Sequence, residues 1–195
     1  MSTPTAVVSE TGLPVGTWQL DPIHSTASFA VRHMGIATFR GRFEQFADAS
    51  LIVDQLGDAK LVGTVRADSI LVKDGALAAH LQSPDFFDVE RYPEIRFVSS
   101  TIRRDADKLV VDGQLTVKDQ TRSVDARGMI NGPAEVLGGA TKIGITLDTV
   151  IDRTEFGLNF NAQLPAGGAA VANEVKLTVE LELTLTQGDA QGEMG

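Results

Sequence analysis

Three histidines, His24, His33 and His80, are the side chains best suited to metal binding or proton transfer, and the chain contains no cysteine. His24 and His33 are nine residues apart, and an odd separation places two side chains on opposite faces of an extended strand. A metal shared by these two is therefore disfavoured, and without thiolates the sequence offers no zinc-type ligand set. We expect no metal site.

The segment Asp21–Ser25 (DPIHS) contains the residue types of a catalytic triad. A triad needs the three side chains to converge through hydrogen bonds, whereas neighbours in an extended chain point apart, and no Gly-x-Ser-x-Gly elbow occurs. Asp21-Pro22 is better interpreted as a turn before a long strand. The carboxylates of Asp85 and Asp88 fit the start of a helix. Because phosphate-binding, dinucleotide and calcium motifs are also missing, we predict no catalytic residue, no cofactor and no enzyme.

The charge of the chain limits its partners. The formal net charge is −9 and the isoelectric point is near 4.7, so the surface repels nucleic acid and allows at most transient contact with an anionic membrane. Residues Met1–Val15 have no basic region followed by an apolar run, and no stretch approaches the ~20 apolar residues of a membrane-spanning helix. These features predict a cytoplasmic location.

Apolar residues alternate with polar ones along most of the chain, which is typical of strands with one buried face. The clearest example is Val175–Leu185, where six aliphatic residues alternate with Lys, Thr and Glu. Hairpin turn signals occur along the chain at Asp112-Gly113, Asn131-Gly132-Pro133, Gly138-Gly139 and Pro165–Gly168. About eight strands at this spacing predict an all-β, antiparallel up-and-down barrel, with a sandwich as the alternative. The other predicted strands are Thr26–His33, Ala37–Glu44, Leu51–Asp54, Leu61–Val72, Ile95–Ile102, Leu109–Val117, Ser123–Ile130 and Lys142–Arg153.

The segment Lys73–Pro93 breaks this alternation. Its apolar residues have helical spacing, and Ser83-Pro84 resembles the start of a second helix. We predict one or two short helices across one end of the barrel, with the aromatic residues Phe86, Phe87 and Tyr92 closing it. Residues 1–14 and 188–195 are predicted to be flexible tails around a single domain over 15–187.

The inward-facing apolar residues either fill the barrel or surround a cavity, and the alternation alone does not separate these outcomes. Two features favour a cavity. Small residues, Ala27, Gly41, Gly63, Ala67 and Ser99, share the inward phase, and His33 and Arg153 occupy that phase near strand ends, where they could meet a ligand head at the mouth. The predicted apolar lining is Phe29, Val31, Phe39, Phe43, Phe86, Phe87, Phe97, Leu115, Ile145, Leu147 and Leu181.

In its ordered motifs from Trp18 to Thr186 the sequence resembles the YceI-like family. The matching residues are Trp18-x-Leu20-Asp21-Pro22-x-His24-Ser25, Phe29-x-Val31-x-His33-Met34-Gly35, Gly41-x-Phe43, His80-Leu81-x-Ser83-x-Asp85-Phe86-Phe87-Asp88, Tyr92-Pro93-x-Ile95-x-Phe97-x-Ser99, Gly113-x-Leu115-Thr116-Val117, Arg153-x-x-Phe156-Gly157 and Glu174-Val175. It departs from many relatives at Leu77-Ala78, where they have an Arg-Asp pair.

The resemblance implies a lipocalin-like barrel whose apolar tunnel binds a polyisoprenoid lipid, such as an isoprenoid quinone or a polyprenyl phosphate, as a carrier or store. The residues leave two other functions open. An enzyme acting on a small hydrophobic molecule would need a polar cluster with perturbed pKa values deep in the pocket, around His33 or His80. A structural or interaction module would have a filled core and no tunnel. The sequence also leaves a homodimer open.

Overall fold

Strands account for most of the described chain. The computed structural model describes residues 11–186, which form eleven strands and one α-helix, α1 (Gly75–Gln82). Two short 3₁₀ helices, η1 (Ala67–Ser69) and η2 (Arg153–Phe156), follow strand ends. The strands are β1 (Gly16–Leu20), β2 (Thr26–His33), β3 (Ala37–Phe43), β4 (Phe46–Val53), β5 (Ala59–Arg66), β6 (Ile70–Leu71), β7 (Glu94–Asp105), β8 (Lys108–Val117), β9 (Gln120–Glu135), β10 (Thr141–Asp152) and β11 (Val171–Thr186).

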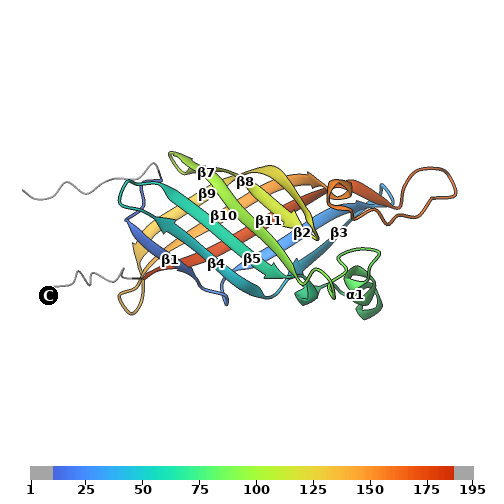
Figure 1. Ribbon diagram of the computed structural model, residues 1–195, viewed down its shortest axis with the longest axis horizontal. Coiled ribbons are helices and arrows are strands. Elements are labelled where there is room, and N and C mark those ends of the chain that lie inside the picture. Colours follow the sequence, from blue (N-terminus) through green and yellow to red (C-terminus); the bar gives the residue numbers. More distant parts are fainter. Residues whose placement is uncertain (1–10, 187–195) are drawn as a thin grey trace, which may run out of the picture.

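The sheet closes on itself through β11, as the ribbon in Figure 1 shows. The end of β11 pairs with β1 (Trp18 opposite Leu185), and its first half pairs with β2 (Val179 opposite Ala27). The pairs β1/β2, β3/β4 and β5/β6 each act as one interrupted strand, so the ring has eight strand positions, all antiparallel. The predicted all-β barrel is confirmed, and the sandwich is excluded because the hydrogen-bonded ring is continuous.

The two ends of the barrel differ in their covering. One end carries the β2–β3 turn, α1 with its flanking loops, the β8–β9 turn and the long connection from η2 to β11. The opposite end carries the β4–β5, β7–β8 and β9–β10 turns and the start of β1. In Figure 1 these are the right and left ends respectively. We call them the α1 end and the distal end.

One predicted helix is present and the second is not. Asp74 caps α1, because its side chain accepts a hydrogen bond from the Leu77 N–H at 2.8 Å. Ser83 ends this helix and does not begin another: its hydroxyl donates to the His80 carbonyl at 2.7 Å. Residues 84–87 then form turns, in which the Ser83 carbonyl accepts from the Phe86 and Asp88 N–H groups.

The largest hydrophobic cluster fills the distal half of the barrel. Trp18, Val111 and Leu183 have no exposed surface there, and Leu13 is 2% exposed in the same cluster. The packed domain therefore extends N-terminal to the predicted boundary at residue 15. Of the two predicted tails, the structure describes residues 11–14. Residues 1–10 and 188–195 lie outside the described residues. No helix among residues 11–186 is long and apolar enough to cross a membrane.

We predict that Gly128→Ala weakens the barrel. A Cβ at this position of β9 would lie 1.7 Å from the Thr146 carbonyl oxygen of β10, so the two strands would have to separate. We expect a loss of about 1–3 kcal/mol in the free energy of unfolding, measured by urea denaturation. Gly144→Ala is the matched control, because a Cβ there would have no atom of a neighbouring strand within 4 Å. Equal stabilities for the two variants would contradict this account.

Candidate functional site

The half of the barrel nearer α1 contains a cavity of about 570 Å³. Its wall is made almost entirely of aliphatic and aromatic side chains from the strands, from α1 and from the loops that cover this end. The distal hydrophobic cluster lies beyond it along the barrel. The volume falls within the ~300–1,000 Å³ typical of small-ligand sites. The predicted residues found in this wall are Phe29, Val31, Phe39, Phe43, Phe86, Phe87, Phe97, Leu115, Leu147 and Leu181.

Ile145 is the predicted lining residue that the structure places elsewhere. It points inward, as its phase with Leu147 requires, but it is buried in the distal cluster with Ile143 and Leu183. Alternation determines which face of a strand a side chain occupies. It does not determine whether that depth of the barrel is packed or empty.

Small inward-facing residues contribute unequally to the space. A Cβ added at Gly63 would have the Cβ of Ala49 as its nearest neighbour, at 4.0 Å, and both residues line the cavity. At Gly41 the ring of Phe29 already occupies the corresponding space, 2.5 Å from such a Cβ. Ser99 instead accepts a hydrogen bond from the Leu61 N–H on its buried hydroxyl, at 2.8 Å.

An aromatic group closes part of the α1 end. The ring of His80, on α1, lies edge-on to Phe86 and to Phe160, with centroids 5.1 and 4.6 Å apart. The rings of Phe86 and Phe160 are themselves 5.1 Å apart, and all three residues line the cavity. Tyr92 does not join them, contrary to the prediction. It lies in a separate polar surface pocket with Arg91 and Lys118.

Arg153 lies at the α1 end of the cavity, as predicted, but its guanidinium is already engaged. The side chain is 4% exposed and donates to the carbonyls of Ala172 (2.9 Å), Phe160 (3.0 Å) and Val171 (3.2 Å), and to that of Leu158. Burial lowers the pKa of Arg153 from its ordinary value, although a guanidinium stays charged at any physiological pH. The residue therefore fixes the connection between η2 and β11 and places a positive charge beside the cavity.

His33 and its neighbour Arg32 face opposite sides of β2. His33 is half-buried and lines the cavity. Arg32 is exposed on the outer face, where it donates to the Gly35 carbonyl at 2.7 Å. His33 and Arg153, the two residues predicted to meet a ligand head, therefore adjoin the cavity, whereas Arg32 does not.

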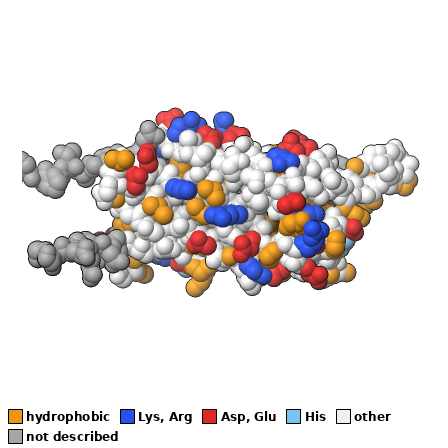
Figure 2. All heavy atoms as spheres, viewed as in Figure 1, with side chains coloured by type: hydrophobic (Ala, Val, Ile, Leu, Met, Phe, Trp, Pro, Cys, Tyr) orange, Lys and Arg blue, Asp and Glu red, His pale blue; other side chains and the backbone are white. Residues whose placement is uncertain are grey.

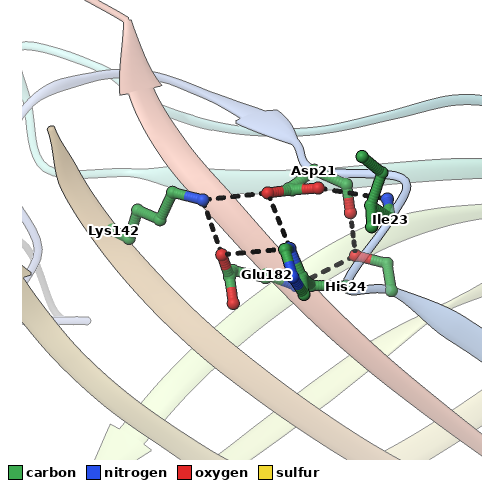
Figure 3. Close-up of polar contacts among 6 residues, drawn as sticks. Asp21, Ile23, His24, Lys142 and Glu182 are labelled. Carbon is green, nitrogen blue, oxygen red and sulfur yellow. Dashed lines mark hydrogen bonds and ion pairs between the residues drawn. The ribbon is translucent and has the colours of Figure 1, made fainter. Parts of the chain in front are cut away.

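A second polar cluster lies outside the barrel, around the break between β1 and β2 (Figure 3). The Lys142 ammonium on β10 donates to Asp21 at 2.9 Å and to Glu182 of β11 at 2.6 Å. His24 Nδ1 lies 3.0 Å from the same Asp21 oxygen. The hydroxyl of Ser25 donates to the Asp21 carbonyl at 2.7 Å and accepts from the Glu182 N–H at 3.0 Å. The Asp21–Ser25 motif is thus a connector that joins the interrupted strand to β10 and β11.

This cluster contains the donor set Asp21, His24 and Glu182, whose ligand atoms lie within 4.8 Å of one another. Lys142 already lies between the two carboxylates, as Figure 3 shows, and supplies the compensating positive charge. Hydrogen bonds from Lys142 and then from His24 hold the pKa of Asp21 well below its usual range. The bonds to Glu182 and Asp21 raise the pKa of Lys142.

Comparison with known proteins agrees with this architecture. The family model of the YceI-like domain matches residues 18–183. A UPF0312 protein of Staphylococcus aureus (strain USA300) is 28% identical over 173 residues, covering 86% of this chain and 96% of its own length. The crystal structure of Burkholderia cenocepacia BcnA superposes with a TM-score of 0.70 at 23% identity, covering 84% of this chain and 98% of that one.

Two further solved structures have the same fold. The Campylobacter jejuni YCEI protein has a TM-score of 0.68 at 24% identity and covers 80% of this chain and 90% of its own. A polyisoprenoid binding domain from Saccharophagus degradans, implicated in plant cell wall breakdown, has a TM-score of 0.63 at 13% identity. It covers 88% of this chain and 99% of its own.

A closed eight-stranded barrel with an apolar interior cavity defines a lipocalin-like barrel of the kind that holds a hydrophobic ligand. Within this class the chain belongs to the YceI-like family, whose domain spans nearly all of the described residues.

We predict that Lys142→Met lowers the melting temperature at neutral pH, because Asp21 and Glu182 lose their shared partner. A carboxyl group whose pKa is lowered on folding stabilises the folded protein at pH values above its ordinary pKa, which is 3.8 for aspartate. That stabilisation disappears as the pH falls through the lowered pKa. The gap in melting temperature between wild type and variant should therefore narrow under acid conditions. Lys60→Met, at an exposed lysine on β5, is the control, and equal effects at neutral pH would contradict the assigned role.

We predict that Arg153→Met releases the connection between η2 and β11. Four backbone carbonyls lose their donor, and partial rehydration should limit the cost to about 2–4 kcal/mol in the free energy of unfolding. Amide hydrogen exchange should accelerate mainly over residues 157–172, while Arg127→Met, at an exposed position of β9, should leave it unchanged. A uniform acceleration throughout the barrel would argue against this local role.

Proposed function

We propose that the protein binds a polyisoprenoid lipid in the barrel interior, as a carrier or store. The observation that carries the proposal is the apolar cavity, which is open toward the α1 end and backed by a packed cluster. The Saccharophagus degradans domain of the same fold is described as polyisoprenoid binding, and its likeness supports the proposal through the shared architecture. An isoprenoid quinone and a polyprenyl phosphate are the two ligand types that we propose.

The wall of the cavity suits a branched hydrocarbon chain. Burying one isoprene unit from water contributes up to about 3–4 kcal/mol, less the cost of ordering the chain. A lipid that leaves a bilayer gains little of this energy, because its tail was already dry. Selection among lipids therefore rests on tail length, on packing against residues such as Phe97 and Leu115, and on the head group.

Head-group contacts would come from the α1 end. His33 can donate one hydrogen bond to a quinone carbonyl. Arg153 would act on a phosphate mainly through its charge, since four of its five N–H groups already bind backbone carbonyls. This arrangement favours a ligand whose tail enters first and whose head stays beside these two residues.

The cavity supports the proposed function over a filled-core module. A filled-core module requires packed side chains where this barrel has about 570 Å³ of space. An enzyme requires a polar group with a perturbed pKa deep in the pocket. Arg153 lies at the α1 end of the cavity, and its N–H groups are bonded to backbone carbonyls.

The direct test is native mass spectrometry of protein purified without detergent, followed by organic extraction and identification of the extracted lipid. We expect one prenyl lipid per chain, and its mass would define both head and tail. A ligand-free mass that stays unchanged after incubation with a quinone and with a polyprenyl phosphate would overturn the proposal.

We further predict that Gly63→Leu shortens the space available to the tail. The new side chain would enter the cavity, since the nearest atom to its Cβ is 4.0 Å away on Ala49. Binding of the long prenol solanesol should weaken by about tenfold or more, whereas the shorter farnesol should be less affected. Gly144→Leu adds the same side chain outside the cavity lining. Equal solanesol binding by both variants, measured by displacement of a fluorescent fatty acid, would exclude a tail site beside Gly63.

A further inference from the structure

Exposed apolar side chains gather at the α1 end, beside the cavity. Ile36 is 82% exposed, Met34 44% and Phe160 38%. The first two lie in the β2–β3 turn, and Phe160 lies in the loop over residues 157–170 that leads toward β11. We call the turn at residues 33–37 together with this loop the lip. In Figure 1 both segments project at the right end, opposite the end where β1 starts.

The geometry of the turn keeps Met34 at its tip. Met34 and Gly35 have φ values of 52° and 71°, and the Ile36 N–H donates to the His33 carbonyl at 3.2 Å. Two successive left-handed residues are typical of a type I′ turn, which favours Asn, Asp or Gly at both positions. A methionine there places an apolar side chain at an exposed tip at a conformational cost.

The lip lacks negative charge although the protein is acidic. Among 195 residues the chain has 26 acidic ones, yet residues 26–43 contain no Asp or Glu and residues 156–173 contain no charged residue at all. In Figure 2 the far right end of the molecule accordingly shows white and orange with hardly any red. Arg32 and Arg40 are exposed on the outer face of the strands behind the turn.

An apolar tip with cations behind it matches the order of layers in a phospholipid surface. Apolar side chains enter the boundary between head groups and acyl chains, while arginines remain at the level of the phosphates. The net charge of −9 carried by the whole chain would repel anionic lipids elsewhere on the surface, which favours contact through this end alone and keeps it brief.

The lip also borders the route into the cavity. His33 and Met34 line the cavity from the turn, and Phe160, Ala162 and Ala170 line it from the loop. A surface pressed against the lip would therefore face the aromatic group of His80, Phe86 and Phe160. A water-insoluble molecule could cross there without passing through water.

We propose that the lip docks on a phospholipid bilayer and that an apolar ligand passes between bilayer and cavity at this contact. The passage of ligand rests on the function proposed above, whereas docking does not. Docking is therefore tested on its own, with vesicles and without added ligand.

The experiment is flotation of the protein with phosphatidylcholine vesicles, with and without phosphatidylglycerol. Ile36→Asp should reduce the vesicle-bound fraction by about tenfold, because a carboxylate would have to enter the interface. Leu56→Asp is the matched control: Leu56 is also 82% exposed at a turn, but at the distal end, between β4 and β5. Met34→Asn should reduce binding while preserving or raising the melting temperature, since asparagine tolerates the left-handed conformation.

A fluorescence measurement locates the contact. Trp18, the single native tryptophan, has no exposed surface, so Ile36→Trp and Leu56→Trp each add one exposed reporter. Vesicles should shift the emission to shorter wavelength at position 36 and leave position 56 unchanged.

Failure to float, or equal binding by Ile36→Asp and Leu56→Asp, would overturn docking and leave the lip as a candidate contact for a protein. Docking combined with a ligand-free protein in the mass spectrometry experiment would instead refute the proposed ligand and leave the docking surface standing.

Discussion

β11 supplies the hydrogen bonds that close the sheet, and the interior exists because of that closure. Its sixteen residues pair with β10 along one edge, and with β1 and β2 in succession along the other. The change of partner leaves a gap between Leu20 and Thr26 on the neighbouring interrupted strand. The Asp21–Ser25 connector bridges this gap with bonds to Lys142 and Glu182. A motif whose residue types suggest catalysis thus completes the barrel wall.

Closure gives every inward side chain an apolar surrounding, but packing along the barrel is uneven. Large aliphatic residues and Trp18 fill the distal half, while the other half keeps a cavity beside Gly63 and Ala49. The closed ring of hydrogen-bonded strands surrounds both halves. The cavity is the volume proposed to hold a ligand, and the packed distal half gives it a closed end.

The α1 end combines closure with access. His80, Phe86 and Phe160 come from three different segments and contact one another through their rings. Arg153 fixes the segment that carries Phe160 through backbone carbonyls, while α1 carries His80. The ring contacts therefore cover part of the cavity's end between segments that are each held separately. The apolar, acid-free lip lies at this same end, so the way into the cavity and the surface proposed to meet a bilayer coincide.

The turn signals Asp112-Gly113 and Asn131-Gly132 were wrong as strand boundaries, since they lie inside β8 and β9. Alternation along the chain instead predicted most of the strands and their inward faces, because side-chain direction in a strand has a period of two residues. It therefore identified Phe29, Phe97 and most other lining residues correctly. The depth of each residue along the barrel was decided only by the tertiary structure: Ile145 and Leu147 share a phase and both meet the packed cluster, but of the two Leu147 alone also lines the cavity. The partners of Arg153 and Lys142 likewise come from segments distant in sequence, and no local pattern encodes them. The cavity itself is a difference between enclosed and occupied volume, which exists only once the barrel has closed.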